Sequence, residues 1–157
     1  MVSLLIKLML SSICGGIIGY ERHKKNSNVG IRTYMTVCIG TTLVMIIAVK
    51  CFEDTNKSDI TRLAAAAIQG VSFLGAGLII HKDNRLEGLT TAAILWTTAI
   101  IGLAIGYGMY LEAILATMIF IIIGDFLLLF YKKEIEKYKS EHEKSSAESD
   151  KHHNKEK

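Results

Sequence analysis

Long apolar runs separated by short charged segments constrain the fold of this chain more than any other feature. A membrane-spanning helix needs about 20 consecutive, mostly apolar residues. The runs predict spans over 2–20, 33–52 and 63–80, and the region 89–131 is too long for one span. We expect that region to divide near 108–111, because a single long tilted helix would far exceed the bilayer thickness. The sequence therefore predicts an all-α, polytopic membrane helix bundle of about five transmembrane helices.

Composition supports this class and separates a tail from the bundle. Half of the residues are hydrophobic, and the mean hydropathy is +0.34 although the end of the chain is polar. Such a chain is too apolar for an ordinary water-soluble domain. Residues 1–131 form the predicted transmembrane domain, and residues 132–157 form a charged tail rich in Lys and Glu. The start of the tail could extend the last helix, and the part from Ser145 onward is expected to be disordered.

The basic residues of the short loops predict the orientation in the membrane. The first loop, residues 21–32, carries four lysines and arginines against one acid. The third loop carries Lys82 and Arg85, and the tail begins with Lys132 and Lys133. Loops rich in Lys and Arg stay in the cytoplasm. We therefore expect these loops and the C-terminal tail to be cytoplasmic and the N-terminus to lie outside.

Small residues recur at a spacing of four in three of the predicted helices. In lipid, helices associate through close backbone approach rather than hydrophobic burial, and small residues permit that approach. The helix-packing candidates are Gly15 with Gly19, Gly102 with Gly106, and Gly70 with Ala66. These pairs predict a compact bundle and make a homo-oligomer plausible.

A phosphate-binding loop is excluded as the role of the glycines in the third run. Gly70 and Gly75 have the glycine spacing of that motif. The motif then requires Lys followed by Ser or Thr. Ala76 and Gly77 stand at those two positions. The glycines are therefore interpreted as helix-packing residues.

Asp125 is the strongest candidate for a functional charge inside the membrane. It lies in the run IIIGDFLLLF, seven residues before the tail, and so about 10 Å from the cytoplasmic surface. A carboxylate at that depth is costly unless it is paired, hydrated or protonated. By depth its expected partner is Arg22 or Arg32, with Glu21 at the same level. A purely structural ion pair is the alternative. Lys7, in the outer part of the first run, is expected to extend its amine outward.

The sequence offers a weak metal candidate and no catalytic pair. Glu53, Asp54 and Asp59 could form a Mg²⁺ site, since this ion takes carboxylate and water oxygens, but nearby basic residues oppose it. The histidines are expected at the surface, and the three cysteines lack metal-ligand spacing. A hydrolytic enzyme is therefore not expected, no cofactor is predicted, and the presence of a metal site stays open.

Five segments occur in an order that resembles a known family. They are GGIIGYER (15–22), GIRT (30–33), DITRLAA (59–65), SFLGAG (72–77) and GLTTAAILW (88–96). Together they resemble the MgtC/SapB family of bacterial inner-membrane proteins, over about residues 3 to 130. Each segment alone is weak, and the ordered series is specific. The family-like positions are Glu21, Arg22, Gly30, Arg32, Thr33, Asp59, Arg62, Gly75, Gly77, Thr90, Thr91 and Trp96.

The resemblance implies a multi-pass bacterial plasma-membrane protein of four or five spans. Family members are associated with growth in low Mg²⁺ and with survival inside host phagocytes, and the best-known member is thought to restrain the F-type ATP synthase. Many longer members carry a C-terminal domain resembling an ACT domain, where this chain has its charged tail. Ala66 and Ser72 stand where the family has glutamine and glycine, so the packing of the third helix is expected to differ there.

Two main classes of function follow. The first is a non-enzymatic membrane regulator that acts through contact with another membrane complex, supported by the helix-packing faces. The alternative is a Mg²⁺ or proton transporter or channel that uses Asp125 with Arg22 and Arg32, although no inverted repeat is evident. An enzyme on a lipid-linked substrate is a third class, supported only by the basic cytoplasmic loops. The expected partners are the lipid bilayer and a membrane protein, not a nucleic acid.

Overall fold

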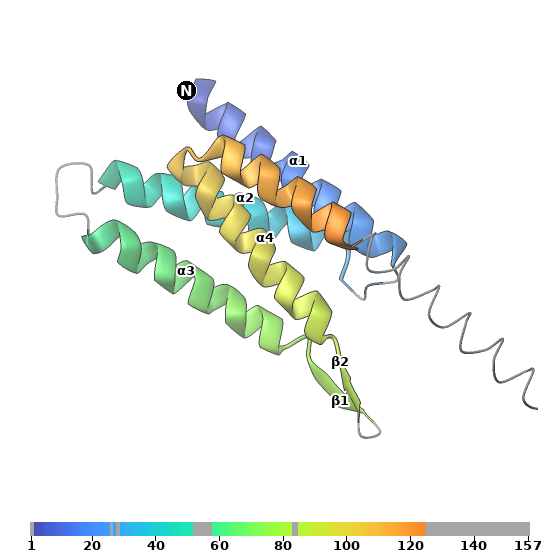
Figure 1. Cartoon of the computed structure of the whole chain (residues 1–157). Coiled ribbons are helices and arrows are strands. Elements are labelled where there is room, and N and C mark those ends of the chain that lie inside the picture. Colours follow the sequence, from blue (N-terminus) through green and yellow to red (C-terminus); the bar gives the residue numbers. More distant parts are fainter. Residues whose placement is uncertain (1, 26, 28, 52–57, 83–84, 125–157) are drawn as a thin grey trace, which may run out of the picture. The chain divides into compact units, whose positions relative to one another are not determined.

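The computed structural model is helical, and it describes residues 2–25, 27, 29–51, 58–82 and 85–124. In chain order the elements are α1 (Val2–Lys24), α2 (Ile31–Cys51), α3 (Ser58–Ala76), β1 (Ile80–Lys82), β2 (Arg85–Glu87) and α4 (Leu89–Tyr107) (Figure 1). A further apolar helix follows at Tyr110–Gly124. The predicted class, a polytopic helix bundle, is confirmed.

Two compact units divide the chain, Met1–Ile119 and Phe120–Lys157. The first unit holds α1 to α4, the two strands and most of the helix Tyr110–Gly124. In the second unit the structure describes residues 120–124 alone, which continue that helix. Asp125 and the charged tail therefore lie outside the described residues.

Three of the described helices, α1, α2 and α4, are long and apolar enough to cross a membrane. The apolar stretches Ile60–Ala76 of α3 and Tyr110–Gly124 are shorter. The second stretch ends at Gly124 because the described residues end there.

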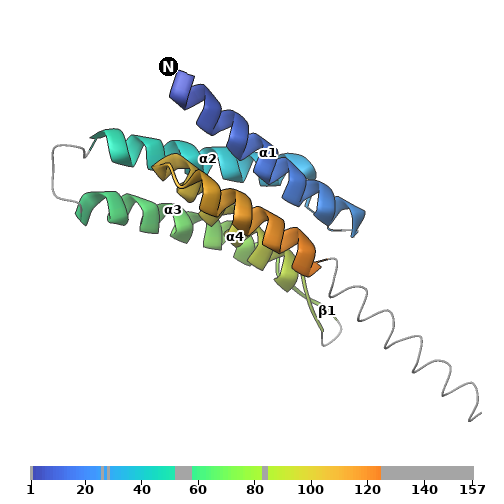
Figure 2. The same ribbon diagram turned by 45° about the horizontal axis from the view of Figure 1, so that its top comes forward.

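α2 and α4 form the centre of the first unit. α2 packs against α1, α3 and α4, and α4 also contacts α1 and α3. Figures 1 and 2 show α1 and α3 on opposite sides of this central pair. The side chains of Ile18, Tyr34, Leu95 and Ile105 are almost fully buried between these helices.

The break predicted near 108–111 is confirmed, and Gly108 makes it. Gly108 has a φ of 114°, a left-handed conformation that strongly favours glycine. Its N–H lies 3.1 Å from the carbonyl oxygen of Ile105, and the N–H of Met109 lies 2.9 Å from that of Ala104. These two hydrogen bonds form a Schellman motif, which ends α4 and lets the chain turn.

The helix expected over 63–80 ends earlier, at Ala76, and Ile80 belongs to a strand. The segment expected as a short turn is an antiparallel hairpin in which Ile80 pairs with Glu87 and His81 with Leu86. Gly88 follows the hairpin with a φ of 85°. A Cβ on Gly88 would lie 2.9 Å from the carbonyl carbon of Leu78, so the return of the chain into α4 requires glycine.

Candidate functional site

Two glycine pairs bring α1 and α4 into close contact with α2. A Cβ on Gly15 would lie 2.8 Å from the carbonyl oxygen of Tyr34 and 2.9 Å from the Cβ of Cys38. A Cβ on Gly19 would lie 2.9 Å from the Cα of Ile31. Real Cβ atoms do not approach this closely, so α1 and α2 meet at a distance that only glycine permits.

The second pair makes the same contact from α4. A Cβ on Gly106 would lie 2.6 Å from both the Cβ of Met45 and the carbonyl oxygen of Thr42. A Cβ on Gly102 would collide with the hydroxyl of Thr41 and with the backbone of Cys38. The buried Thr42 hydroxyl lies 2.8 Å from the carbonyl oxygen of Gly102 and so can donate a hydrogen bond between the helices.

The glycines of α3 differ from these pairs. Gly75 is buried, and a Cβ there would lie 3.5 Å from the Cβ of Ala92 on α4. Gly70 is exposed, and a Cβ there would meet nothing within 4 Å. Within the described chain, α3 thus approaches α4 at Gly75 and leaves Gly70 and Ala66 on its outer surface.

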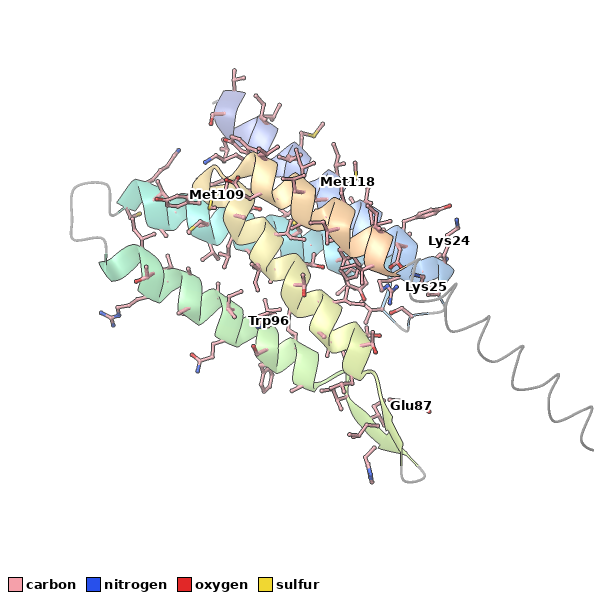
Figure 3. The ribbon with its side chains drawn as sticks, viewed as in Figure 1. Lys24, Lys25, Glu87, Trp96, Met109 and Met118 are labelled. Atoms are coloured by element: carbon pink, nitrogen blue, oxygen red, sulfur yellow. The ribbon has the colours of Figure 1, made fainter. Side chains whose placement is uncertain are left out.

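A charged cluster lies at the C-terminal end of α1, and we call Glu21, Arg22 and Lys25 the Glu21 cluster. Both Nε and Nη2 of Arg22 donate to the carboxylate of Glu21, and Lys25 pairs with the same carboxylate from one turn on. Glu21 is only 7 % exposed. A carboxylate this enclosed needs such partners, because burial removes the water that would solvate its charge. Figure 3 shows Lys25 beside Lys24 at this end of α1.

Polar groups from three other segments surround this cluster. The hydroxyl of Ser27 lies 3.5 Å from that of Thr91 at the start of α4, and it accepts a 3.4 Å hydrogen bond from the N–H of Val29. Tyr34 of α2 is fully buried, and its hydroxyl, near Ser27, lacks a hydrogen bond of good geometry within the described chain. The end of α1, the first loop and the starts of α2 and α4 thus meet here.

The structure brings together some of the predicted site residues and separates others. Glu21 and Arg22 are paired, and Thr91 is linked to the same region through Ser27. Five other family-like side chains that the structure describes are exposed: Arg32, Thr33, Arg62, Thr90 and Trp96. Gly30 has open space around it, and Gly77 follows the end of α3.

Several predicted partners fall outside the described residues. Asp125 is one of them, so its pairing with Arg22 or Arg32 stays a prediction. Glu53 and Asp54 of the weak Mg²⁺ candidate are also outside, and the side chain of Asp59 is not described. Among the described residues, no three His, Cys, Asp or Glu side chains gather as a metal site would require.

Sequence reasoning missed three members of this region and one contact at the other end of the bundle. Lys25 follows Glu21 by four residues, a helical spacing that could have revealed their pair. No local signal marks Ser27 or Tyr34. Lys7 was expected to extend outward, and the sequence did not indicate the partner of its amine, which donates a 2.7 Å hydrogen bond to the carbonyl oxygen of Gly106 in the last turn of α4.

The helices and their glycine contacts define a multi-pass α-helical membrane protein. Its family is the MgtC family, which matches residues 8–137, and the chain belongs to that family. It is accordingly a multi-pass protein of the bacterial inner membrane.

Curated relatives support this assignment. YhiD of Escherichia coli strain K12, named as a candidate magnesium transporter, is 40 % identical over 68 % of this chain and 52 % of its own length. SapB of Bacillus subtilis strain 168 is 37 % identical over 77 % of this chain and 54 % of its own length. MgtC of Brucella abortus strain 2308 is 34 % identical over 73 % and 47 %. The chain thus spans about half the length of these relatives. No solved structure matches the chain.

Proposed function

We propose that this protein is a non-enzymatic regulator of the bacterial inner membrane that supports adaptation to low Mg²⁺ and life inside a host. It acts through contact with another membrane complex, for which the F-type ATP synthase is the candidate that the family resemblance suggests. The observation that carries the proposal is the outer surface of α3.

The α3 surface consists of exposed residues at helical spacing: Ala65, Ala66, Gln69, Gly70, Ser72, Phe73 and Ala76. Phe73 is 81 % exposed and stands among small side chains. Small residues let a second helix approach closely in lipid, and an aromatic side chain supplies contact area. The glycine pairs of α1 and α4 are already occupied by α2, whereas Gly70 is open. This surface is therefore suited to a partner helix.

The relatives fit a non-enzymatic role, since none of the three carries the name of an enzyme. The name of YhiD favours a second candidate function, transport of Mg²⁺. The path for Mg²⁺, or for protons, would include Asp125. A carboxylate inside a membrane span is a frequent part of such paths.

Site-specific photocrosslinking in intact bacteria tests the regulatory function. A photoreactive amino acid replaces Phe73 or Ala66 on the α3 surface, and the matched control replaces Leu5, which is 67 % exposed on α1. We expect a defined crosslinked protein from the two α3 positions and not from Leu5. Crosslinks to a second copy of the chain alone would contradict a partner complex and indicate a homo-oligomer.

Flux measurements separate the transporter. The purified full chain in proteoliposomes is tested for Mg²⁺ and proton uptake beside Asp125→Asn. If folded protein carries neither ion while the gene still supports growth at low Mg²⁺, regulation is favoured. Uptake that the Asp125→Asn change abolishes would instead establish transport.

A further inference from the structure

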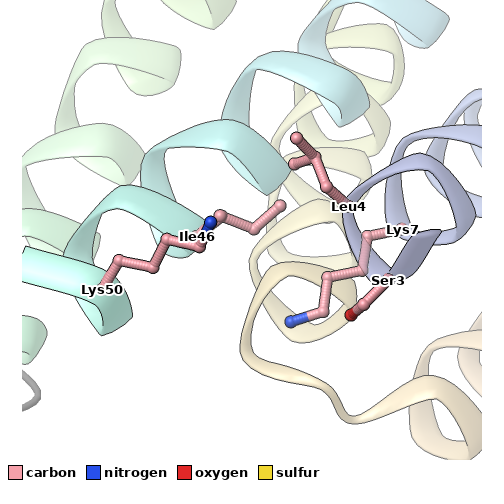
Figure 4. A pocket seen from close by; sticks show the side chains of 5 residues that line it. All are labelled: Ser3, Leu4, Lys7, Ile46 and Lys50. Atoms are coloured by element: carbon pink, nitrogen blue, oxygen red, sulfur yellow. The ribbon is translucent and has the colours of Figure 1, made fainter. Parts of the chain in front are cut away.

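A small basic pocket lies between α1 and α2, at the end of the bundle opposite the Glu21 cluster. Ser3, Leu4 and Lys7 of α1 and Ile46 and Lys50 of α2 line this pocket of about 100 Å³ (Figure 4). Among the described residues, its lining contains two lysines and one hydroxyl and no acidic side chain. We call it the Lys7–Lys50 pocket.

Lys7 is held at one wall of the pocket by the end of α4. Its amine donates a 2.7 Å hydrogen bond to the carbonyl oxygen of Gly106, in the last turn of that helix. Carbonyl groups in the last turn have no partner within the helix and carry partial negative charge, so a cation is stabilised there. An ammonium group has three donors, and this contact uses one. Two donors of Lys7 remain for a ligand.

Lys50 supplies the second charge from the last turn of α2. Figure 4 shows its amine directed along Ile46 toward the α1 side of the pocket. Within the described chain, neither Lys50 nor Lys7 has an ion pair with an acidic side chain. Two like charges that share a small pocket repel each other, and a bound anion would remove that repulsion.

The position and size of the pocket define the anion. α1 begins at Val2 and α2 ends at Cys51, so the pocket lies at the helix ends, where lipid headgroups meet a spanning protein. A volume of about 100 Å³ exceeds the roughly 30 Å³ that one water occupies and suits a tetrahedral anion. Lysine is a common ligand of phosphate, and phosphate is the anionic group of phospholipid headgroups at this level.

We propose that the Lys7–Lys50 pocket binds a phosphate group, carried by an anionic phospholipid or free as inorganic phosphate. Lys7 and Lys50 contact its oxygens, and Ser3 adds a hydroxyl donor. Leu4 and Ile46 give the pocket an apolar side that would suit the rest of a lipid. This site is independent of the proposed contact at α3, so either can fail without the other.

Lipid binding to the purified full chain tests the proposal. Native mass spectrometry compares phosphatidylglycerol with neutral phosphatidylcholine, each presented at matched concentration to wild type, Lys50→Gln and Lys7→Gln. Lys24→Gln is the control, because it removes the same charge at the opposite end of α1 (Figure 3). Lys50 is exposed, so Lys50→Gln should fold even if Lys7→Gln does not. We expect Lys50→Gln to weaken phosphatidylglycerol binding about tenfold, the effect of losing one charge-assisted hydrogen bond.

A second measurement identifies the source of the phosphate. Thermal unfolding in detergent is followed in three parallel samples: with sodium phosphate, with sodium chloride at equal ionic strength, and with phosphatidylglycerol added in place of phosphate. Stabilisation by phosphate that Lys50→Gln removes would assign the site to the free anion, and stabilisation by phosphatidylglycerol alone would assign it to lipid. Equal binding of both ligands by wild type, Lys50→Gln and Lys24→Gln would overturn the proposal.

Discussion

At the scale of single residues, the Glu21 carboxylate unites the charges at one end of the bundle. Arg22 and Lys25 both contact it, and the region around it is enclosed. We expect Glu21→Gln to lower the free energy of unfolding by about 2 kcal/mol, because two cations lose their shared anion. Thermal unfolding in detergent, followed by the fluorescence of Trp96, measures the change. Glu112→Gln, at an exposed acid, is the control and should shift stability by less than about 0.5 kcal/mol. Equal melting temperatures for the two variants would contradict a stabilising role.

Contacts at this scale were the hardest to predict from the sequence. Lys7 and Gly106 stand 99 positions apart, and no local pattern connects a lysine in one apolar run with the end of another. The sequence placed Glu21 and Arg22 at one level in the membrane and did not predict their ion pair, because it gives the depth of a charge but not its rotamer.

At the scale of elements, the sequence predicted those helix boundaries that depend on a local run of residues and missed the features that depend on distant pairing. The break at Gly108 was predicted because the apolar region 89–131 is too long for one span, which a run of local residues shows directly. The hairpin of β1 and β2 was missed, since it is short and depends on pairing across a turn rather than on strand propensity. The spacing of small residues marks helix faces in α1, α3 and α4, but it cannot say which face meets a neighbour.

Gly102 is packed against α2, whereas Gly70 faces open space. This difference predicts opposite effects on stability when each glycine is replaced by alanine. Gly102→Ala should lower the free energy of unfolding by about 2 kcal/mol, because the new methyl group collides with the backbone of α2. Gly70→Ala should leave stability unchanged or raise it by up to about 1 kcal/mol, since alanine favours helix and the position is open. Thermal unfolding of the two variants and wild type checks both effects. A loss of stability in Gly70→Ala would show that the α3 surface is already covered in the folded protein, for example by a second copy.

At the scale of the whole molecule, the two ends of the bundle differ in chemistry. The end with the Glu21 cluster carries the starts of α2 and α4, and its buried carboxylate is paired with Arg22 and Lys25. The end with the Lys7–Lys50 pocket carries the start of α1 and the end of α2, and no acidic side chain of the described residues lines the pocket beside its two lysines. Only the orientation of the chain in the membrane decides which of these ends faces the cytoplasm.

The basic first loop predicts that the Glu21 end is cytoplasmic and that the Lys7–Lys50 pocket faces outward. Cys51 tests this without an added residue, because it is an exposed cysteine at the end of α2. In cells whose inner membrane is intact and whose outer layers let the reagent through, a maleimide that cannot cross the inner membrane should label Cys51. In Cys51→Ser carrying His23→Cys, at the opposite end of the bundle, labelling should appear only after the membrane is opened. Cys14 and Cys38 are buried, so Cys51→Ser alone should stay unlabelled and serves as the control. If intact cells label the His23→Cys variant and do not label Cys51 in wild type, the orientation is the opposite of the predicted one. The phosphate of the Lys7–Lys50 pocket would then come from the cytoplasmic side.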